Sequence, residues 1–270
     1  MPDLQHELDV AREVAAAGAA TAASYFGSDV PSERKEDGTL VSEADRATEE
    51  TLRSGIAAAF PDHNILGEEG GLQGAAGGPP RDGAPTWVVD PIDGTNNFLA
   101  GIPVWGTLVG LRVDGASVVG VAHAPAIGEV YEAALGSGAR LNGRPIEVVK
   151  DVSLEDATIA YASVQSFFDA GLKTFFEEIV GKTWRSRGFG DFWGHMLVAR
   201  GAVHVMIETD LSIWDVVALQ PIVAEAGGTL TTLGGDPWDD HGSCLSTNGT
   251  LHDEVLALLR TTTPGWTEPR

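Results

Sequence analysis

Apolar residues recur at helical spacing near the start of the chain. The residues that share this pattern are Leu4, Leu8, Ala11, Ala15 and Ala19. Positions three or four residues apart lie on one side of an α-helix, so a first helix is expected here. Asp3 is suited to cap its N-terminus, and the glycine and proline within Gly27–Pro31 predict its end near Phe26.

A second helix is predicted between Ser42 and Pro61. Ser42 and Asp45 have the spacing of a capping box, in which a side chain at each position satisfies a backbone N–H group of the other. An extended piece around Glu33–Glu36 is expected before this helix.

Short apolar, β-branched runs follow the second helix. They stand at residues 65–66, 87–89, 104–113, 118–123, 130–135 and 146–149. Turn signals such as Asp114-Gly115 separate the later runs, which predicts antiparallel strands. Residues 70–85 contain six glycines and three prolines, so a mobile loop is expected there.

Strands and helices alternate beyond Asp151. Strands are expected at residues 157–162, 203–207, 229–232 and 243–247, with an extended piece at 184–187. Helices are expected at residues 170–180, 190–200, 214–226 and 251–259. This alternation predicts an α/β half. We therefore expect an α/β, layered fold, with helices and an antiparallel sheet in residues 1–150 and an α/β half in residues 151–270, together forming one structural unit.

One of the predicted strands ends in two carboxylates, Asp90 and Asp93, that flank Pro91. Proline has a fixed φ and no N–H group, so the chain is expected to leave the sheet there. Gly94 allows a tight backbone, and Thr95 is suited to cap the segment that follows. Mg²⁺ commonly takes one or two carboxylates together with a substrate phosphate, and free amides at a turn bind anions. The stretch therefore predicts a metal site beside a phosphate site.

This stretch also resembles other kinds of turn. An Asp-x-x-Asp sequence is by itself more often a solvated turn than a site. An EF-hand loop counted from Asp90 is excluded, because its third and twelfth residues are Ile92 and Gly101. The Asp-x-Asp-Gly-Thr strand end of haloacid-dehalogenase phosphatases is one residue shorter, so that likeness is superficial.

Three separated motifs resemble those of the inositol monophosphatase family. They are Gly67-Glu68-Glu69-Gly70, Asp90-Pro91-Ile92-Asp93-Gly94-Thr95 and Trp214-Asp215, in the order that the family has them. The resemblance extends from about the first helix to Gly235. It implies an α-β-α-β-α sandwich, a metal-dependent phosphomonoesterase activity and a homodimer.

The resemblance also implies a set of metal ligands. Asp90 is expected to bridge two Mg²⁺ ions. Glu68 and the backbone carbonyl of Ile92 complete the first site. Asp93 and Asp215 complete the second, with two to three Mg²⁺ ions per site and Mn²⁺ as a substitute. Asp215 has another interpretation, since an acid in the first turn of a helix is favoured by the helix dipole.

Further roles carried over from the family concern the attacking water and the phosphate. Thr95 and Asp45 are expected to position the water, with no covalent phosphoenzyme, and the amides of Gly94 and Thr95 to bind phosphate. A capping box remains the alternative for Asp45. Lys35 is expected near the site, and Glu69 is an alternative to the glutamate before it.

The segment Arg187–Ala199 resembles the bacterial histidinol-phosphate phosphatase branch of the family, whose members carry Gly-Asp-Phe-Trp at this place. Histidinol phosphate has an ammonium group and an imidazole, which an acidic pocket lined by Asp191 and Glu208 would suit. A helix N-cap is the alternative for Asp191. Substrate contacts are therefore expected from Asp93, Gly94, Thr95, Arg187, Gly190, Asp191, Glu208 and Asp215.

Two other functions remain open at this point. The chain could be an inositol monophosphatase or a phosphatase acting on several sugar phosphates. It could also be a catalytically silent relative that serves as a metal-binding scaffold. Loss of a ligand is the usual mark of such a relative, and no expected ligand is lost here.

Composition narrows the class of partner. The 39 acidic and 17 basic residues give a formal net charge of −22, which opposes binding to nucleic acid. No apolar run approaches the length of a membrane span, so a cytoplasmic protein is expected. The family resemblance implies that its partner is a small phosphate ester. Cys244 is the single cysteine, which excludes an intramolecular disulfide.

Overall fold

The computed structural model describes residues 4–28, 31–34, 40–238 and 240–268. The chain forms two compact units, Met1–Arg144 with Trp214–Ile222, and Pro145–Ile213 with Val223–Arg270. None of the described helices is long and apolar enough to cross a membrane.

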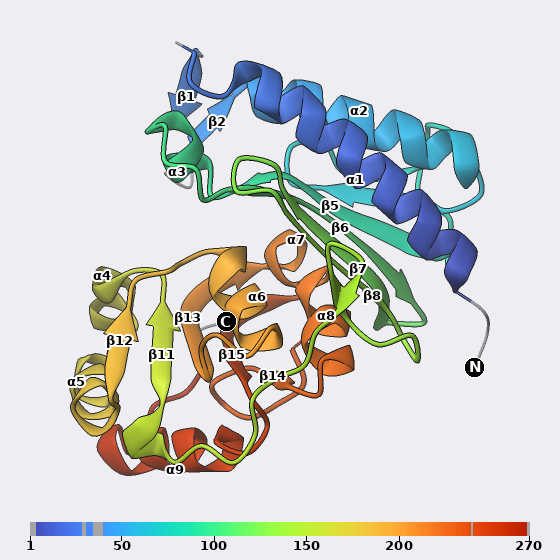
Figure 1. The fold of residues 1–270 in the computed structure, drawn as a ribbon. Coiled ribbons are helices and arrows are strands. Elements are labelled where there is room, and N and C mark those ends of the chain that lie inside the picture. The colour runs from blue at the N-terminus through green and yellow to red at the C-terminus, as the bar shows by residue number, and fades with distance from the viewer. Residues whose placement is uncertain (1–3, 29–30, 35–39, 239, 269–270) are drawn as a thin grey trace. The chain divides into compact units, whose positions relative to one another are not determined.

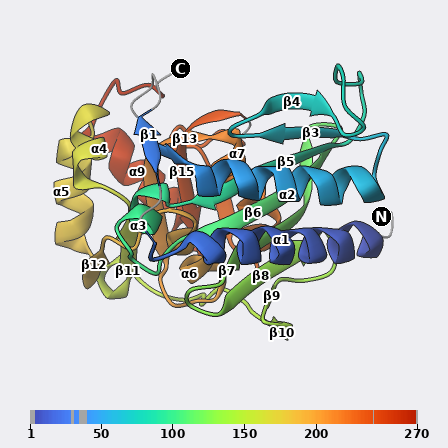
Figure 2. The ribbon, with the colours of Figure 1, turned by 90° about the horizontal axis from the view of Figure 1, so that it is seen from above.

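Two long helices of the first unit, α1 (Gln5–Tyr25) and α2 (Glu43–Ala59), pack side by side (Figures 1 and 2). Small residues make up much of the buried face of α1, so the helices approach closely, and Gly18 lies against Leu52 of α2. Leu4 stands at the N-cap of α1 and makes no side-chain capping bond. Asp3, the predicted cap, lies outside the described residues.

The predicted capping box of α2 is confirmed. An oxygen of Asp45 accepts hydrogen bonds from the backbone N–H of Ser42, at 2.7 Å, and from its hydroxyl, at 2.6 Å. A small antiparallel pair, β1 (Ser32–Arg34) and β2 (Leu40–Ser42), leads into the helix. Lys35 lies outside the described residues.

An eight-stranded sheet carries the two helices, in the strand order β10-β9-β8-β7-β6-β5-β3-β4. Its strands are β3 (Asn64–Gly67), β4 (Gly71–Gly74), β5 (Thr86–Asp93), β6 (Gly106–Val113), β7 (Ala116–Ala124), β8 (Glu129–Ala134), β9 (Arg140–Leu141) and β10 (Arg144–Pro145). β3 and β5 are parallel, whereas the pairs from β5 to β9 and the pair of β3 with β4 are antiparallel. The predicted antiparallel meander is confirmed.

Two predictions at the margins of this sheet are wrong. Part of the expected loop at residues 70–85 is strand β4, which forms a hairpin with β3. Residues 146–149 are not a strand, because Val148 is buried as an irregular segment whose N–H bonds to the carbonyl of Ala226. An apolar run buried in this way has the same pattern as a strand.

Strand β5 does not end at Pro91, as was predicted, but continues to Asp93. Asp90 lies opposite Leu108 of β6 and Asp93 lies opposite Gly106, so three steps on β5 match two on β6. The extra residue is a β-bulge, a place where a sheet tolerates proline. The bulge changes the directions of the side chains on either side of it, which suits a functional strand end.

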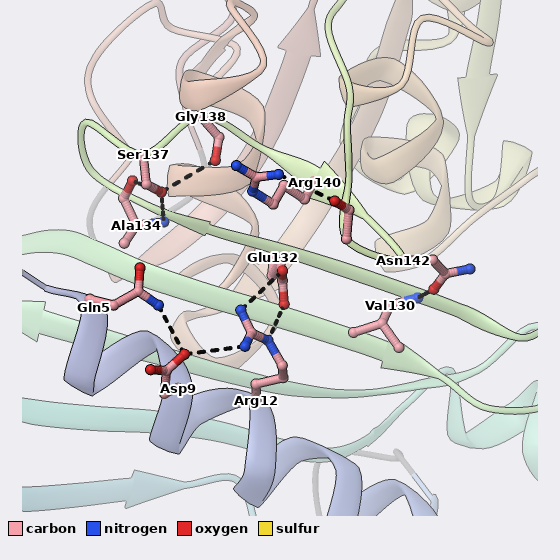
Figure 3. Close-up of polar contacts among 11 residues, drawn as sticks. Gln5, Asp9, Arg12, Val130, Glu132, Ala134, Ser137, Gly138, Arg140 and Asn142 are labelled. Carbon is pink, nitrogen blue, oxygen red and sulfur yellow. Dashed lines mark hydrogen bonds and ion pairs between the residues drawn. The ribbon is translucent and has the colours of Figure 1, made fainter.

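An ion pair fastens α1 to the sheet. Arg12 points from α1 toward Glu132 on β8, and its guanidinium donates to both carboxylate oxygens, at 2.6 and 3.1 Å (Figure 3). Glu132 is buried, so the Arg12 guanidinium is needed to balance a carboxylate away from water. The bond to Glu132 raises the pKa of Arg12, so the guanidinium stays charged.

The second unit contains a five-stranded sheet in the order β12-β11-β13-β15-β14. Its strands are β11 (Thr158–Tyr161), β12 (Arg185–Arg187), β13 (Val205–Ser212), β14 (Thr229–Thr231) and β15 (His241–Thr247). Its helices are α4 (Val164–Asp169), α5 (Lys173–Lys182), α6 (Phe192–Ala199) and α9 (His252–Thr262). The predicted alternation of strands and helices is confirmed. The helix expected at 170–180 is α5, which begins at Lys173, and the short helix α4 before it was not predicted.

Side chains of β13 alternate between two faces of this sheet. Val205 and Ile207 belong to a core that also contains residues of α4, α5 and α9. Met206 points to the opposite face, where a Cβ atom at Gly194 of α6 would overlap its sulfur. Glu208 follows Met206 by two positions and therefore shares the face that α6 covers.

Candidate active site

Two of the predicted metal ligands lie at the end of β5. Asp90 is 2% exposed and Asp93 is also buried. One carboxylate oxygen from each of Asp90, Asp93 and Asp215 lies within 4.8 Å of the others. Of the groups of potential metal ligands among the described residues, this is the one that the geometry brings together.

Glu68 reaches the same region through strand pairing. In the parallel pair of β3 and β5, Gly67 lies beside Val89. The next residues along the two strands, Glu68 and Asp90, therefore emerge at the same edge of the sheet. Glu68 does not belong to the group of three carboxylates whose oxygens lie within 4.8 Å of one another. Among the neighbouring charges, however, that of Glu68 raises the pKa of Asp90 the most.

Asp215 is supplied from a distant part of the sequence. The predicted helix at 214–226 is instead two short helices, α7 (Ile213–Val216) and α8 (Leu219–Glu225). The residues that join them pack on Gly110 of β6 and Gly120 of β7, which lie opposite each other in the sheet. A Cβ atom at Gly120 would overlap the carbonyl of Ala218. These glycines allow the segment that carries Asp215 to lie against the sheet.

The electrostatics of this cluster favour a cation. Burial raises the pKa of Asp90 well above its usual value, and the charges of Glu68, Asp93, Asp215 and Asp45 raise it further. Buried like charges disfavour ionisation unless a positive charge compensates them. Because all the candidate donors are oxygens, from carboxylates and from the Ile92 carbonyl, the site suits a hard divalent cation.

The Thr95 side chain lies between the carbonyl of Ile92 and Asp45, and its role in positioning water stays a prediction. Its hydroxyl lies 3.0 Å from the carbonyl oxygen of Ile92 and 3.5 Å from an oxygen of Asp45. Asp45 thus fits both interpretations, since one oxygen caps α2 and the other faces Thr95. The prediction that Thr95 itself caps the next helix is wrong: Gly94, at φ +82°, is the N-cap of α3 (Thr95–Leu99). The left-handed backbone there requires glycine.

The second unit holds the predicted acidic pair. Asp191 occupies the N-cap position of α6, but its side chain makes no capping bond. Its backbone has φ +54°, a conformation that costs a non-glycine residue about 1–3 kcal/mol. Burial and the neighbouring charge of Glu208 raise the pKa of Asp191 to about 7. A strained carboxyl beside a second acid is costly for stability, and such residues concentrate at functional sites.

Two neighbours of Asp191 were also predicted to contact substrate. Gly190 is required by packing, because a Cβ atom there would lie 2.6 Å from the Cα atom of Ala162. Arg187 lies on the exposed edge strand β12, and its guanidinium donates to the carbonyl of Ser186. Its contact with substrate stays a prediction, as does that of Gly190.

Two buried residues were not predicted from the sequence, one bonded to Glu208 and one bonded to the turn that contains Glu68. His195 of α6 is fully buried, with one ring nitrogen 2.8 Å from a carboxylate oxygen of Glu208 and the other 2.7 Å from the hydroxyl of Ser246. Glu49 of α2 accepts the backbone N–H groups of Glu69 and Gly70. Neither has a metal-type sequence spacing; the signal was only that each is a polar residue on a helix face that packs inward.

The chain is similar to a family of known proteins over almost its whole length. The model of the inositol monophosphatase family matches residues 3–263. This chain belongs to the inositol monophosphatase family. It is 41% identical to a histidinol-phosphatase of Streptomyces coelicolor, over 96% of this chain and 98% of the relative. It is 40% identical to a histidinol-phosphatase of Mycobacterium tuberculosis, over 87% and 90% of the two chains.

A solved structure agrees with this assignment. An inositol monophosphatase of Thermotoga maritima matches 98% of this chain and 99% of its own, with a TM-score of 0.83 and 30% identity. The α/β layered fold class is therefore confirmed. The family is one of metal-dependent phosphatases, and the cluster of Asp90, Asp93 and Asp215 fits a metal.

Proposed function

We propose that this chain is a Mg²⁺-dependent phosphatase that hydrolyses L-histidinol phosphate to L-histidinol and phosphate. The observation that best supports this choice of substrate is the position of the Asp191 carboxyl. It lies beside Glu208, is half-buried and has a strained backbone. Such a pair suits an ammonium group, because charge-assisted hydrogen bonds are stronger than those to neutral hydroxyls. The identity of 40–41% with two histidinol-phosphatases supports the same substrate.

The metal would be held by carboxylates of the first unit. Glu68, Asp90 and the Ile92 carbonyl would hold one ion, and Asp90, Asp93 and Asp215 would hold the other. When bound, Mg²⁺ supplies activation of water, orientation of the ester and charge neutralisation at the leaving oxygen. The all-oxygen donor set favours Mg²⁺ and also suits Mn²⁺.

The remaining steps belong to side chains and amides of the chain. Thr95, anchored by Asp45 and the carbonyl of Ile92, would orient the attacking water through its hydroxyl. The N–H groups of Gly94 and Thr95 would donate to the phosphate oxygens. Because water attacks the phosphorus directly, no phosphoenzyme forms.

The substrate ammonium would contact Asp191 and Glu208. A ring nitrogen of His195 lies 2.8 Å from a carboxylate oxygen of Glu208 and holds that side chain in place. Asp191, with a pKa of about 7, is partly protonated near neutral pH. An ammonium group beside it favours the ionised form, so binding would release the carboxyl proton and form an ion pair.

Steady-state hydrolysis by the full chain tests the function. With Mg²⁺ present, kcat/KM for L-histidinol phosphate is expected to exceed that for inositol 1-phosphate by roughly tenfold or more, the value of one charge-assisted hydrogen bond. Excess chelator is expected to abolish both activities. A preference for inositol 1-phosphate would contradict the substrate, and no hydrolysis of either ester with Mg²⁺ would indicate a silent relative.

On the family resemblance, we also propose that the enzyme is a cytoplasmic homodimer. Light scattering of the purified chain is expected to give twice its mass of 28.3 kDa. A single 28.3 kDa species at micromolar concentration would contradict the dimer.

A further inference from the structure

The turn that carries Glu68 is held from one side by a buried ion pair on α2. Residues 68–70 form a three-residue hairpin turn between β3 and β4. Hairpin turns of this length have backbone groups that the strand ladder does not bond. Their partners therefore decide where the Glu68 side chain is directed.

Glu49 takes two of those backbone groups. Its carboxylate oxygens accept the N–H of Glu69 at 2.7 Å and the N–H of Gly70 at 2.8 Å. The carboxylate also accepts the Nε–H of Arg53, at 2.7 Å, and is only 3% exposed. A second nitrogen of Arg53 donates to the carbonyl of Gly71 at 2.6 Å. The pair thus bonds two N–H groups of the turn and the carbonyl of the first residue of β4.

The glycines of the Gly-Glu-Glu-Gly motif reflect the same contact. A Cβ atom at Gly67 would overlap the Glu49 carboxylate. One at Gly70 would lie 2.7 Å from a Glu49 oxygen and 2.8 Å from a terminal nitrogen of Arg53. Neither glycine has a positive φ, so close packing against the ion pair, and not backbone conformation, requires them.

We propose that Glu49 is a positioning residue that fixes the turn so that the Glu68 carboxylate is directed at the metal. Helix α2 then serves the site twice, since Asp45 lies one helical turn before Glu49 and contacts Thr95. A buried ion pair contributes little net stability compared with apolar residues of similar volume, whereas residues that orient metal ligands affect metal affinity strongly. This inference rests on the proposed role of Glu68 as a metal ligand.

Binding of Mn²⁺ to the full chain, followed by electron paramagnetic resonance without substrate, tests the inference. Glu49→Gln keeps the volume but offers one acceptor oxygen in place of two, so affinity for the ion is expected to fall roughly tenfold to a hundredfold. Glu50→Gln is the matched control, because Glu50 is the next residue on the same helix and is exposed. Its Mn²⁺ affinity is expected to equal that of the wild type.

The double variant Glu49→Gln/Glu68→Gln separates positioning from a merely structural role. If Glu49 acts through Glu68, the double variant binds Mn²⁺ as weakly as Glu68→Gln alone. Losses that multiply, or a Glu49→Gln variant that loses thermal stability but not affinity, would overturn the inference. An unchanged affinity in Glu68→Gln would instead contradict the proposed ligand set.

Gly70→Ala tests the same contact from the turn, and replaces Glu49→Gln if that variant does not fold. The atoms nearest to its added methyl group would be those of Glu49 and Arg53. Weaker Mn²⁺ binding, with no further loss when Glu68→Gln is added, is expected. Binding equal to that of the wild type would overturn the inference.

Discussion

The two acidic sites of the molecule differ in how their charge is balanced. In the first unit, Asp90 lies among four other carboxylates whose charges, with burial, raise its pKa well above the usual value. In the second unit, Asp191 has one acidic neighbour, Glu208, and that neighbour is bonded to a buried histidine. The first cluster therefore suits divalent cations, whereas we propose that the second binds the single positive charge of an ammonium group. On this proposal, the density of negative charge distinguishes the two sites.

The largest effect on activity is expected from a substitution in the carboxylate cluster of the first unit. Asp90→Asn removes charge from both proposed metal sites, so kcat/KM is expected to fall by about three powers of ten or more. The same change relieves repulsion among buried carboxylates, so the metal-free variant should be more thermally stable than the wild type. Substantial activity of this variant with Mg²⁺ would show that Asp90 is not an essential metal ligand, and would contradict the assignment of the first cluster as the metal site.

A smaller effect, on stability and on metal affinity, is expected when the segment that contains Asp215 is displaced. Gly120→Ala introduces a methyl group that overlaps the carbonyl of Ala218, at a cost of about 1–3 kcal/mol in unfolding free energy. The displaced segment should also weaken Mn²⁺ binding. Gly181→Ala is the control, because no atom lies within 4 Å of the added Cβ. Urea unfolding and Mn²⁺ titration of both variants check this, and equal results for the two would count against the role of Gly120.

The smallest effect concerns stability and pH at the second site. The pKa of Asp191 is raised from 3.8 to about 7, so the folded state holds a proton that the unfolded state has lost. Stability therefore falls as the pH rises between these two values and stays low above them. Asp191→Asn removes this cost, so its gain in melting temperature should be greater at about pH 8 than at about pH 5. A gain that does not depend on pH would show that Asp191 is charged in both states.

The sequence predicted those parts of the site that lie on adjoining stretches. Asp90, Asp93 and Thr95 belong to one motif, and a capping box placed Asp45 at the start of α2. The continuation of β5 through Pro91 was missed, because a bulge depends on the partner strand. Most of the strands and helices were predicted because their periodicity is local.

Contacts between distant residues could not be predicted. Glu49 and Arg53 have the spacing of an exposed ion pair on a helix, and only the packed turn of β3 and β4 shows that the pair is buried. Likewise, the sequence around Gly120 does not indicate that a side chain there would overlap the carbonyl of Ala218. The roles of these residues depend on tertiary packing, which the local pattern of a single sequence does not show.

The central claim is that Asp191 recognises the ammonium group of the substrate. Its most direct test compares L-histidinol phosphate with 3-(imidazol-4-yl)propyl phosphate, which lacks only the amine, in the wild type and in Asp191→Asn. A charge-assisted hydrogen bond is worth about 1.5–3 kcal/mol, so the wild type should favour the amine-bearing ester by roughly ten- to a hundredfold in kcat/KM. In Asp191→Asn this preference should largely disappear, while kcat/KM for the ester without the amine stays unchanged. An equal loss for both esters, or a preference that survives the substitution, would contradict the claim.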